Sequence, residues 1–200
     1  MRKILFNDKL GLTQAVLEGR KTMTRRMVCT KDVRLPVHLS YDIKTRQLLL
    51  YDACLSLVER SRYAFDEVVA IAQAYKDIYE KRGFDMHDPF TFVGDSAGWT
   101  NKMFVKADLM PHHIKITNIR VEHLQDISDE DCLREGIRLW EDADPEYKLN
   151  PLGKLYEIAG RWDGYKSPRE AFAALIGYVS GEGTWESNPL VWVYEFELVD

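Results

Sequence analysis

Two segments in which polar and apolar residues alternate, 114–124 and 190–198, constrain the fold of this chain more than any other feature. An alternation with a period of two is typical of a β-strand that buries one face. In the first segment the alternation slips by one residue at Asn118, which predicts a β-bulge. Shorter strands are expected at 2–6 and 68–75, and regular helices rarely separate the strands, which argues against a parallel sheet. We therefore expect an α+β fold built on a small curved or barrel-like sheet.

Three helices are expected around this sheet. Each begins near a residue whose side chain can accept a hydrogen bond from a free backbone N–H, and each ends at a glycine. The expected segments are 7–19, with Asn7 or Asp8 as the cap, 128–136 with Ser128 as the cap, and 167–181 with Ser167 as the cap. Residues 37–58 fit either a hairpin or a helix, and residues 76–101 are typical of a surface insertion.

Composition indicates one soluble domain in a reducing compartment. A chain of 200 residues with 46% hydrophobic side chains can bury one sizeable core. No apolar run approaches the roughly 18 residues that cross a bilayer, and the N-terminus lacks the apolar region of a signal peptide, so we expect a cytoplasmic protein with no membrane partner. The scattered Cys29, Cys54 and Cys132 are expected to be buried thiols. Adjacent His112 and His113 cannot chelate together on an extended segment, so no metal or other cofactor is expected.

The charge is distributed unevenly along the chain. The net charge is −5, yet residues 1–31 carry eight Lys and Arg against two acidic residues. The segment 19–26, GRKTMTRR, holds four cations and two hydroxyls directly after a predicted helix. Such side chains can donate hydrogen bonds to phosphates, and arginine can also stack on a base. The segment therefore predicts a local anion site, whereas a solvated basic loop is the alternative of equal weight. A Walker loop is excluded because the upstream glycine and strand are missing.

Four segments resemble one known family. The segment ILFNDKLGLTQAVLEGRKTMTRR (4–26) strongly resembles the opening of the ASCH domain, a branch of the PUA-like superfamily. Residues 66–75, 104–137 and 188–199 are similar to later blocks of the same family, so the resemblance spans nearly the whole chain. It implies a PUA-like curved β-barrel with peripheral helices and insertions near 37–58, 76–101 and 138–166. It also implies that the basic loop faces a cleft suited to RNA or a nucleotide.

The resemblance implies two functions for this cleft. The first is binding of RNA or a nucleotide by the basic loop, whose residues are Arg20, Lys21, Thr22, Thr24, Arg25 and Arg26. Independently of the resemblance, Trp99 beside Lys102 is the best base-stacking candidate, although a hydrophobic plug under the loop is the favoured role. The second is metal-independent hydrolysis of an N4-acylated cytidine-type nucleoside, because some compact members resemble amidohydrolases that use a Lys, a Thr and a Glu. By position these fall on Lys21, Thr24 and Glu135.

The residues themselves are compatible with such chemistry. Thr24 could attack the acyl carbon, Lys21 could take its proton, and Glu135 could orient Lys21 or return a proton to the leaving amine. Nearby arginines would lower the pKa of Lys21 and an adjacent Glu135 would raise it, so both directions stay open. Glu135 could also be a helix-end residue that pairs with a neighbouring arginine or with the loop. A third function is that of a protein-interaction module in which the loop meets an acidic partner.

Overall fold

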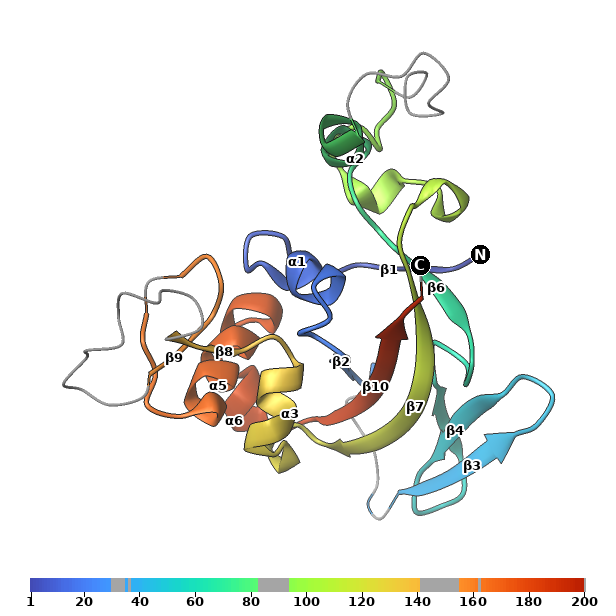
Figure 1. Ribbon diagram of the computed structural model, residues 1–200. Helices are drawn as coiled ribbons and strands as arrows, with labels where there is room; N and C mark the ends of the chain where they lie inside the picture. The colour runs from blue at the N-terminus through green and yellow to red at the C-terminus, as the bar shows by residue number, and fades with distance from the viewer. Residues whose placement is uncertain (30–34, 36, 83–93, 141–154, 162, 200) are drawn as a thin grey trace.

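The computed structural model describes residues 1–29, 35, 37–82, 94–140, 155–161 and 163–199 (Figure 1). These residues form an α+β fold around a five-stranded sheet, as expected. In spatial order the strands are β1 (Lys3–Ile4), β6 (Val68–Ile71), β7 (His113–His123), β10 (Leu190–Leu198) and β2 (Met23–Met27). Only β1 and β6 pair in parallel. Because β1 and β2 are opposite ends of this order, the described strands form an open sheet and not a closed barrel.

The sheet curves enough for its two edges to approach each other. Figure 1 shows β7 and β10 bending together along their length. Arg26 on β2 donates a hydrogen bond of 2.6 Å from Nη2 to the carbonyl oxygen of Leu5, directly after β1. The predicted bulge is confirmed, because Glu195 pairs with Asn118 while the next residue of β10 pairs with Ile116. A bulge of this kind increases the local bend and twist of a strand.

The centre of β10 is buried on both faces, which the sequence alternation did not predict. Val193 and Tyr194 point to opposite faces, and each has 0% of its surface exposed. On the Tyr194 face a second sheet covers the strand, and the Tyr194 hydroxyl accepts a hydrogen bond from the backbone N–H of Arg62. That sheet comprises β3 (His38–Asp42), β4 (Gln47–Tyr51) and β5 (Leu57–Arg60). The hairpin alternative for residues 37–58 is therefore confirmed.

Two of the three predicted helices begin at their predicted caps. In α3 (Asp129–Arg134) the Ser128 hydroxyl accepts a hydrogen bond of 3.1 Å from the N–H of Asp131. In α5 (Pro168–Ser180) the Ser167 hydroxyl does the same for Glu170. The cap of α1 (Leu12–Leu17) was predicted wrongly. That helix follows Gly11, whose φ of +62° lies in the left-handed region that glycine adopts most easily, while Asp8 accepts a hydrogen bond from the Thr13 hydroxyl.

Residues 68–75 were predicted as one strand, but β6 ends at Ile71 and α2 (Tyr75–Arg82) begins at the end of that segment. The remaining elements are short; they are β8 (Arg138–Leu139), β9 (Tyr156–Glu157), α6 (Thr184–Ser187) and three 3₁₀ turns at Lys102–Phe104, Ala107–Leu109 and Leu124–Asp126. Cys132 is buried as expected, whereas Cys29 and Cys54 are exposed, so that expectation was wrong for both. Among the described helices, none combines the length and the apolar character that crossing a bilayer requires.

Candidate functional site

Lys21 and Glu135 form a buried pair between the end of α1 and the end of α3. Gly19 ends α1 with a φ of +71°, and the backbone N–H of Lys21 then bonds to the carbonyl of Ala15. This turn directs the Lys21 side chain inward. Its Nζ lies 2.6 Å from Oε2 of Glu135 and 2.7 Å from the carbonyl oxygen of the same residue. Only 2% of the Lys21 side chain and 5% of the Glu135 side chain are exposed, although 114 residues separate them.

Burial sets the direction in which the pKa of Lys21 is shifted. Removal from water lowers the pKa of the Lys21 ammonium below its ordinary value, and this effect exceeds the opposing influence of Glu135. Arg26 and Arg25 lower the pKa further by repulsion. The lowered pKa answers the question that the sequence left open. Repulsion by the neighbouring arginines was expected to be the cause, but burial is the larger one.

Arg25 is bound on every side by protein groups. Its Nε and Nη2 donate to Glu122 at 2.9 and 2.6 Å. Nη2 also donates to Asp131 at 3.1 Å, and Nη1 donates to Glu135 and to the sulfur of Met23, each at 3.1 Å. A guanidinium group has five N–H donors, so these five contacts use all of them. With 1% of its side chain exposed, Arg25 has no donor left for a phosphate.

Further ion pairs extend this arrangement toward the surface. Arg120 contacts Asp131 at 2.6 Å, and Arg134 contacts Glu195 at 2.7 Å. Thr22 and Arg134 are joined twice, by a backbone bond of 3.0 Å and by a bond of 3.2 Å from Nε to the threonine hydroxyl. We call the whole set the ion-pair network; it comprises Lys21, Arg25, Arg120, Arg134, Glu122, Asp131, Glu135 and Glu195. The ion-pair network fastens α3 to the sheet.

Thr24 lies on the face of β2 opposite to that of Arg25. It pairs with Tyr194 in the sheet and is 5% exposed. Among the hydrogen bonds of the described residues, none joins Thr24 to Lys21. The Lys21 Nζ lies 5.8 Å from the Phe6 ring centre, and Phe6 lies 5.8 Å from Phe196, which shares the Tyr194 face of β10.

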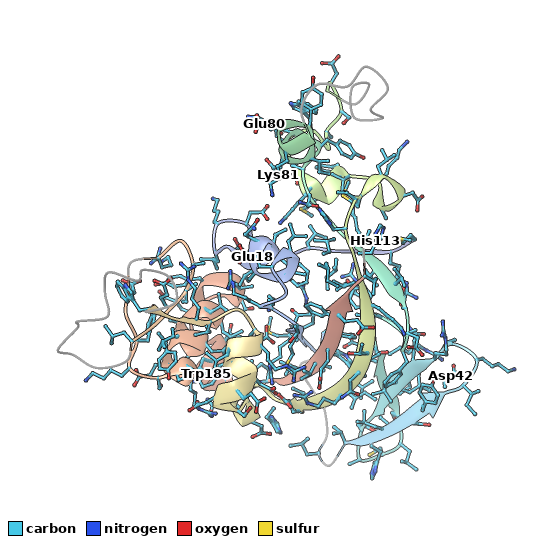
Figure 2. All side chains as sticks on the ribbon, viewed as in Figure 1. Glu18, Asp42, Glu80, Lys81, His113 and Trp185 are labelled. Atoms are coloured by element: carbon cyan, nitrogen blue, oxygen red, sulfur yellow. The ribbon has the colours of Figure 1, made fainter. Side chains whose placement is uncertain are left out.

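The other predicted binding residues are dispersed. Arg20 is exposed and pairs with Glu18 at the end of α1, which Figure 2 labels. Arg26 spans the two sheet edges as described above. Trp99 packs on Tyr79 of α2 with ring centres 5.7 Å apart, within a second hydrophobic cluster separate from the main core. The structure therefore brings Lys21, Thr22, Arg25 and Glu135 together, and it places Arg20 and Trp99 elsewhere.

Sequence reasoning missed half of the ion-pair network. Arg120, Glu122 and Glu195 occupy polar positions of β7 and β10, and the sequence pattern suggested no role for them. Opposite charges at diagonal positions of two neighbouring strands are a signal that could have paired Arg120 with Glu195, because Arg120 lies opposite Val193 and Glu195 lies opposite Asn118. Asp131 lies in the predicted helix 128–136, and its role in the ion-pair network was also missed. Its two oxygens accept from three arginines, one of which is Arg25.

The described part of the chain contains no group of three or more His, Cys, Asp or Glu side chains arranged to hold a metal ion. The charged groups of the site contact one another instead. In comparisons with known proteins, no family model, no characterised protein and no solved structure matches this chain. The site is therefore interpreted from its own geometry.

Proposed function

We propose that this chain is a metal-independent amidohydrolase with a PUA-like fold of the ASCH type, acting on an N4-acylated cytidine-type nucleoside. The buried Lys21–Glu135 pair carries this proposal. A lysine whose pKa is lowered by burial, held by a carboxylate 2.6 Å away, has the properties of a general base. The resemblance to ASCH proteins assigns roles to these same two residues and to Thr24.

In the proposed reaction the Thr24 hydroxyl attacks the acyl carbon and Lys21 takes the hydroxyl proton. The C–N bond then breaks, and the proton passes from Lys21 to the departing amine of the base. Water hydrolyses the resulting acyl ester, which releases the carboxylic acid and restores Thr24. Glu135 positions the Lys21 amine throughout. Hydrogen bonds between reacting groups often form only in the substrate complex, so the absence of a Thr24–Lys21 bond in the free protein is compatible with these roles.

Hydrolysis is favoured over phosphate binding by the state of the cations. Arg25 has no free donor, and Lys21 is bound to Glu135. With Lys21 protonated, four cations of the ion-pair network face four carboxylates and the network is neutral; in the form that acts as a base, with a neutral Lys21 amine, the network carries one negative charge. A neutral set of satisfied ion pairs does not attract phosphates, but it can hold one lysine in a fixed orientation.

The test is the release of acetate from N4-acetylcytidine. Thr24→Ala should abolish release while leaving nucleoside affinity within about 1 kcal/mol, which is the typical contribution of one neutral hydrogen bond. The matched control is Thr22→Ala. Thr22 is a threonine of the same loop, its hydroxyl contacts Arg134, and the proposed reaction gives it no role. If the wild-type protein releases no more acetate than Thr24→Ala does, the proposal fails for this substrate.

Binding of RNA or a nucleotide without hydrolysis is the second candidate, and the exposed Arg20 favours it. Among the described residues its guanidinium contacts Glu18, whose carboxylate is itself 43% exposed, so a phosphate can compete for it. If Arg20 contacts one phosphate, its contribution to the slope of log affinity for single-stranded RNA against log salt should be about −0.7. Arg20→Met should flatten this slope. A slope steeper than about −2, unchanged in Arg20→Met, would place the contacts on other residues.

A further inference from the structure

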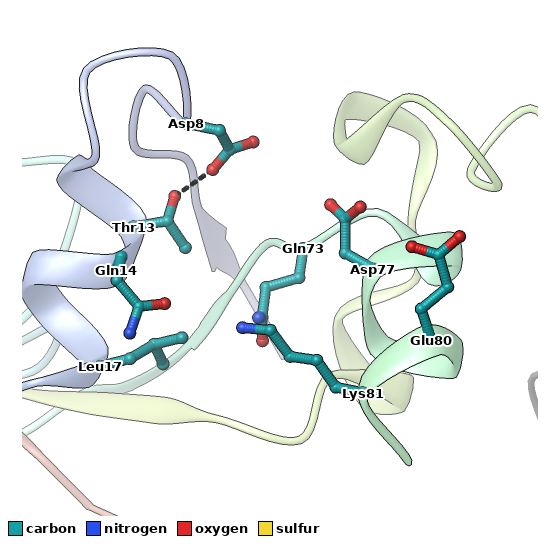
Figure 3. A pocket seen from close by; sticks show the side chains of 8 residues that line it. All are labelled: Asp8, Thr13, Gln14, Leu17, Gln73, Asp77, Glu80 and Lys81. Atoms are coloured by element: carbon teal, nitrogen blue, oxygen red, sulfur yellow. Dashed lines mark hydrogen bonds between the residues drawn. The ribbon is translucent and has the colours of Figure 1, made fainter. Parts of the chain in front are cut away.

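A cavity of about 350 Å³ lies between α1 and α2, apart from the ion-pair network. Helix α1 contributes Thr13, Gln14 and Leu17 to its wall, and α2 contributes Asp77, Glu80 and Lys81. Figure 3 shows these side chains facing one another across the space between the two helices. The volume is within the range of cavities that hold small molecules.

Gln73 lies at the floor of this cavity and has an unused acceptor. It follows β6, and Figure 3 shows its side chain extending into the space between the helices. Only 6% of the residue is exposed, and its side-chain oxygen Oε1 is buried with no hydrogen-bond partner. A buried acceptor without a partner destabilises the folded protein, because the water that it bonds in the unfolded chain is not replaced. A ligand with an N–H donor would supply the missing bond.

The carboxylate of Asp77 selects the sign of such a ligand. It is one of three carboxylates that line the cavity together with the ammonium of Lys81, and the other two, Asp8 and Glu80, are already paired with lysines. Asp8 contacts Lys102 at 2.7 Å and Glu80 contacts Lys76 at 3.6 Å. Asp77 forms no ion pair with any described residue. Together with the buried acceptor of Gln73, an unpaired carboxylate favours a positively charged group that carries N–H donors.

We propose that this cavity binds a small organic cation with N–H donors, of the primary-amine class. The ammonium donates to Oε1 of Gln73 and is neutralised by Asp77. A metal ion does not fit the same residues, because no three of the described carboxylate, imidazole or thiol groups are arranged to hold one. Lys81 is exposed, and Figure 3 shows its side chain extending toward the Gln73 amide, so an entering cation must displace it.

The proposed cation site is separate from the proposed reaction. Leu12 and Ala15, on the opposite side of α1, lie beside Gly136 and the aliphatic part of Lys21. Helix α1 therefore stands between the cavity and the Lys21–Glu135 pair. Binding of an amine and hydrolysis of an amide can each be present or absent without the other.

The test is calorimetric titration with putrescine, and tetramethylammonium serves as a cation that has no N–H donor. Putrescine should bind saturably below about 10 mM, whereas tetramethylammonium should bind at least about tenfold more weakly, because it leaves Gln73 without a partner. Asp77→Asn, which keeps the size of the side chain, should weaken putrescine binding about fivefold or more. Lys81→Met should strengthen it, since a competing positive charge is removed.

Two further variants complete the design. Gln73→Met removes the acceptor at similar volume and should weaken putrescine binding about tenfold. Glu182→Gln changes a carboxylate in a different concavity, beside Trp185, and should leave the affinity unchanged. Equal affinity for the two cations, or an affinity unaffected by Asp77→Asn, would overturn the proposal. Absence of saturable putrescine binding would overturn it as well.

Discussion

The two sides of α1 differ in whether their polar groups are satisfied. On one side, Arg25 uses all five of its N–H donors on protein atoms, and Lys21 is held by Glu135. On the other side, the Gln73 oxygen is buried without a partner and Asp77 has no ion pair among the described residues. The basic loop attracts attention in the sequence, yet the cavity opens elsewhere. A run of cations indicates an anion site only if the fold leaves those cations free.

The largest effect is expected in the reactivity of the Cys132 thiol. Because Cys132 lies in α3, its reactivity reports whether α3 stays docked on the ion-pair network. Burial raises the pKa of this thiol to about 12, whereas Cys29 and Cys54 are exposed. Because only the thiolate reacts, Cys132 should react with a thiol reagent at pH 8 about a thousandfold more slowly than the other two. Mass spectrometry should therefore find two labels on the native protein and three in denaturant. Rapid labelling of all three native thiols would show that α3 undocks readily.

The next effect concerns stability. Arg25→Met removes the cation that three buried or half-buried carboxylates share, so these charges lose their compensation. Loss of one partner of a buried ion pair typically costs about 3–5 kcal/mol, and the free energy of unfolding in urea should fall by that amount. Arg20→Met is the control, since its exposed pair should contribute less than about 1 kcal/mol. Similar losses in both variants would contradict the contrast between buried and exposed cations.

A smaller effect should appear in the pH dependence of stability. The folded protein lowers the pKa of Lys21, so between that pKa and the ordinary value of 10.5 the unfolded chain binds more protons than the folded one. Stability contributed by this group must therefore rise with pH in that interval. Relative to Lys21→Met, the wild-type free energy of unfolding should increase as the pH rises toward 10.5. A decrease would mean that Glu135 outweighs burial.

Local signals predicted local structure well. The Ser128 and Ser167 caps and the bulge near Asn118 depend on residues close in sequence, and all three were identified. The start of α1 was misplaced because the chain enters this helix through Gly11 in a left-handed conformation and not through a capping side chain. Such a conformation produces no periodic pattern in the sequence. A curved sheet was expected, but how closely its two edges approach each other was not, because the bond from Arg26 to Leu5 joins two edge strands that no local pattern relates.

The candidate site was predictable only where a motif marked it. Lys21, Thr24 and Glu135 were proposed from the resemblance, and the structure brings Lys21 and Glu135 into contact. Nothing in the sequence showed that Arg25 would be fully occupied, because its partners lie about a hundred residues away along the chain. The cavity at Gln73 was missed because a glutamine after a short strand has no distinctive pattern. Which polar groups remain unpaired is a property of the assembled fold.

The most direct test of the central claim is the effect of Lys21→Met on acetate release from N4-acetylcytidine. Methionine is slightly shorter than lysine and unbranched, so it can fill most of a site that is 2% exposed without overpacking it. It removes the amine that is proposed to accept the Thr24 proton. Release should fall at least about a hundredfold, to the Thr24→Ala background, while Arg20→Met should retain wild-type turnover. Undiminished turnover in folded Lys21→Met protein would show that the Lys21–Glu135 pair only holds α3 in place.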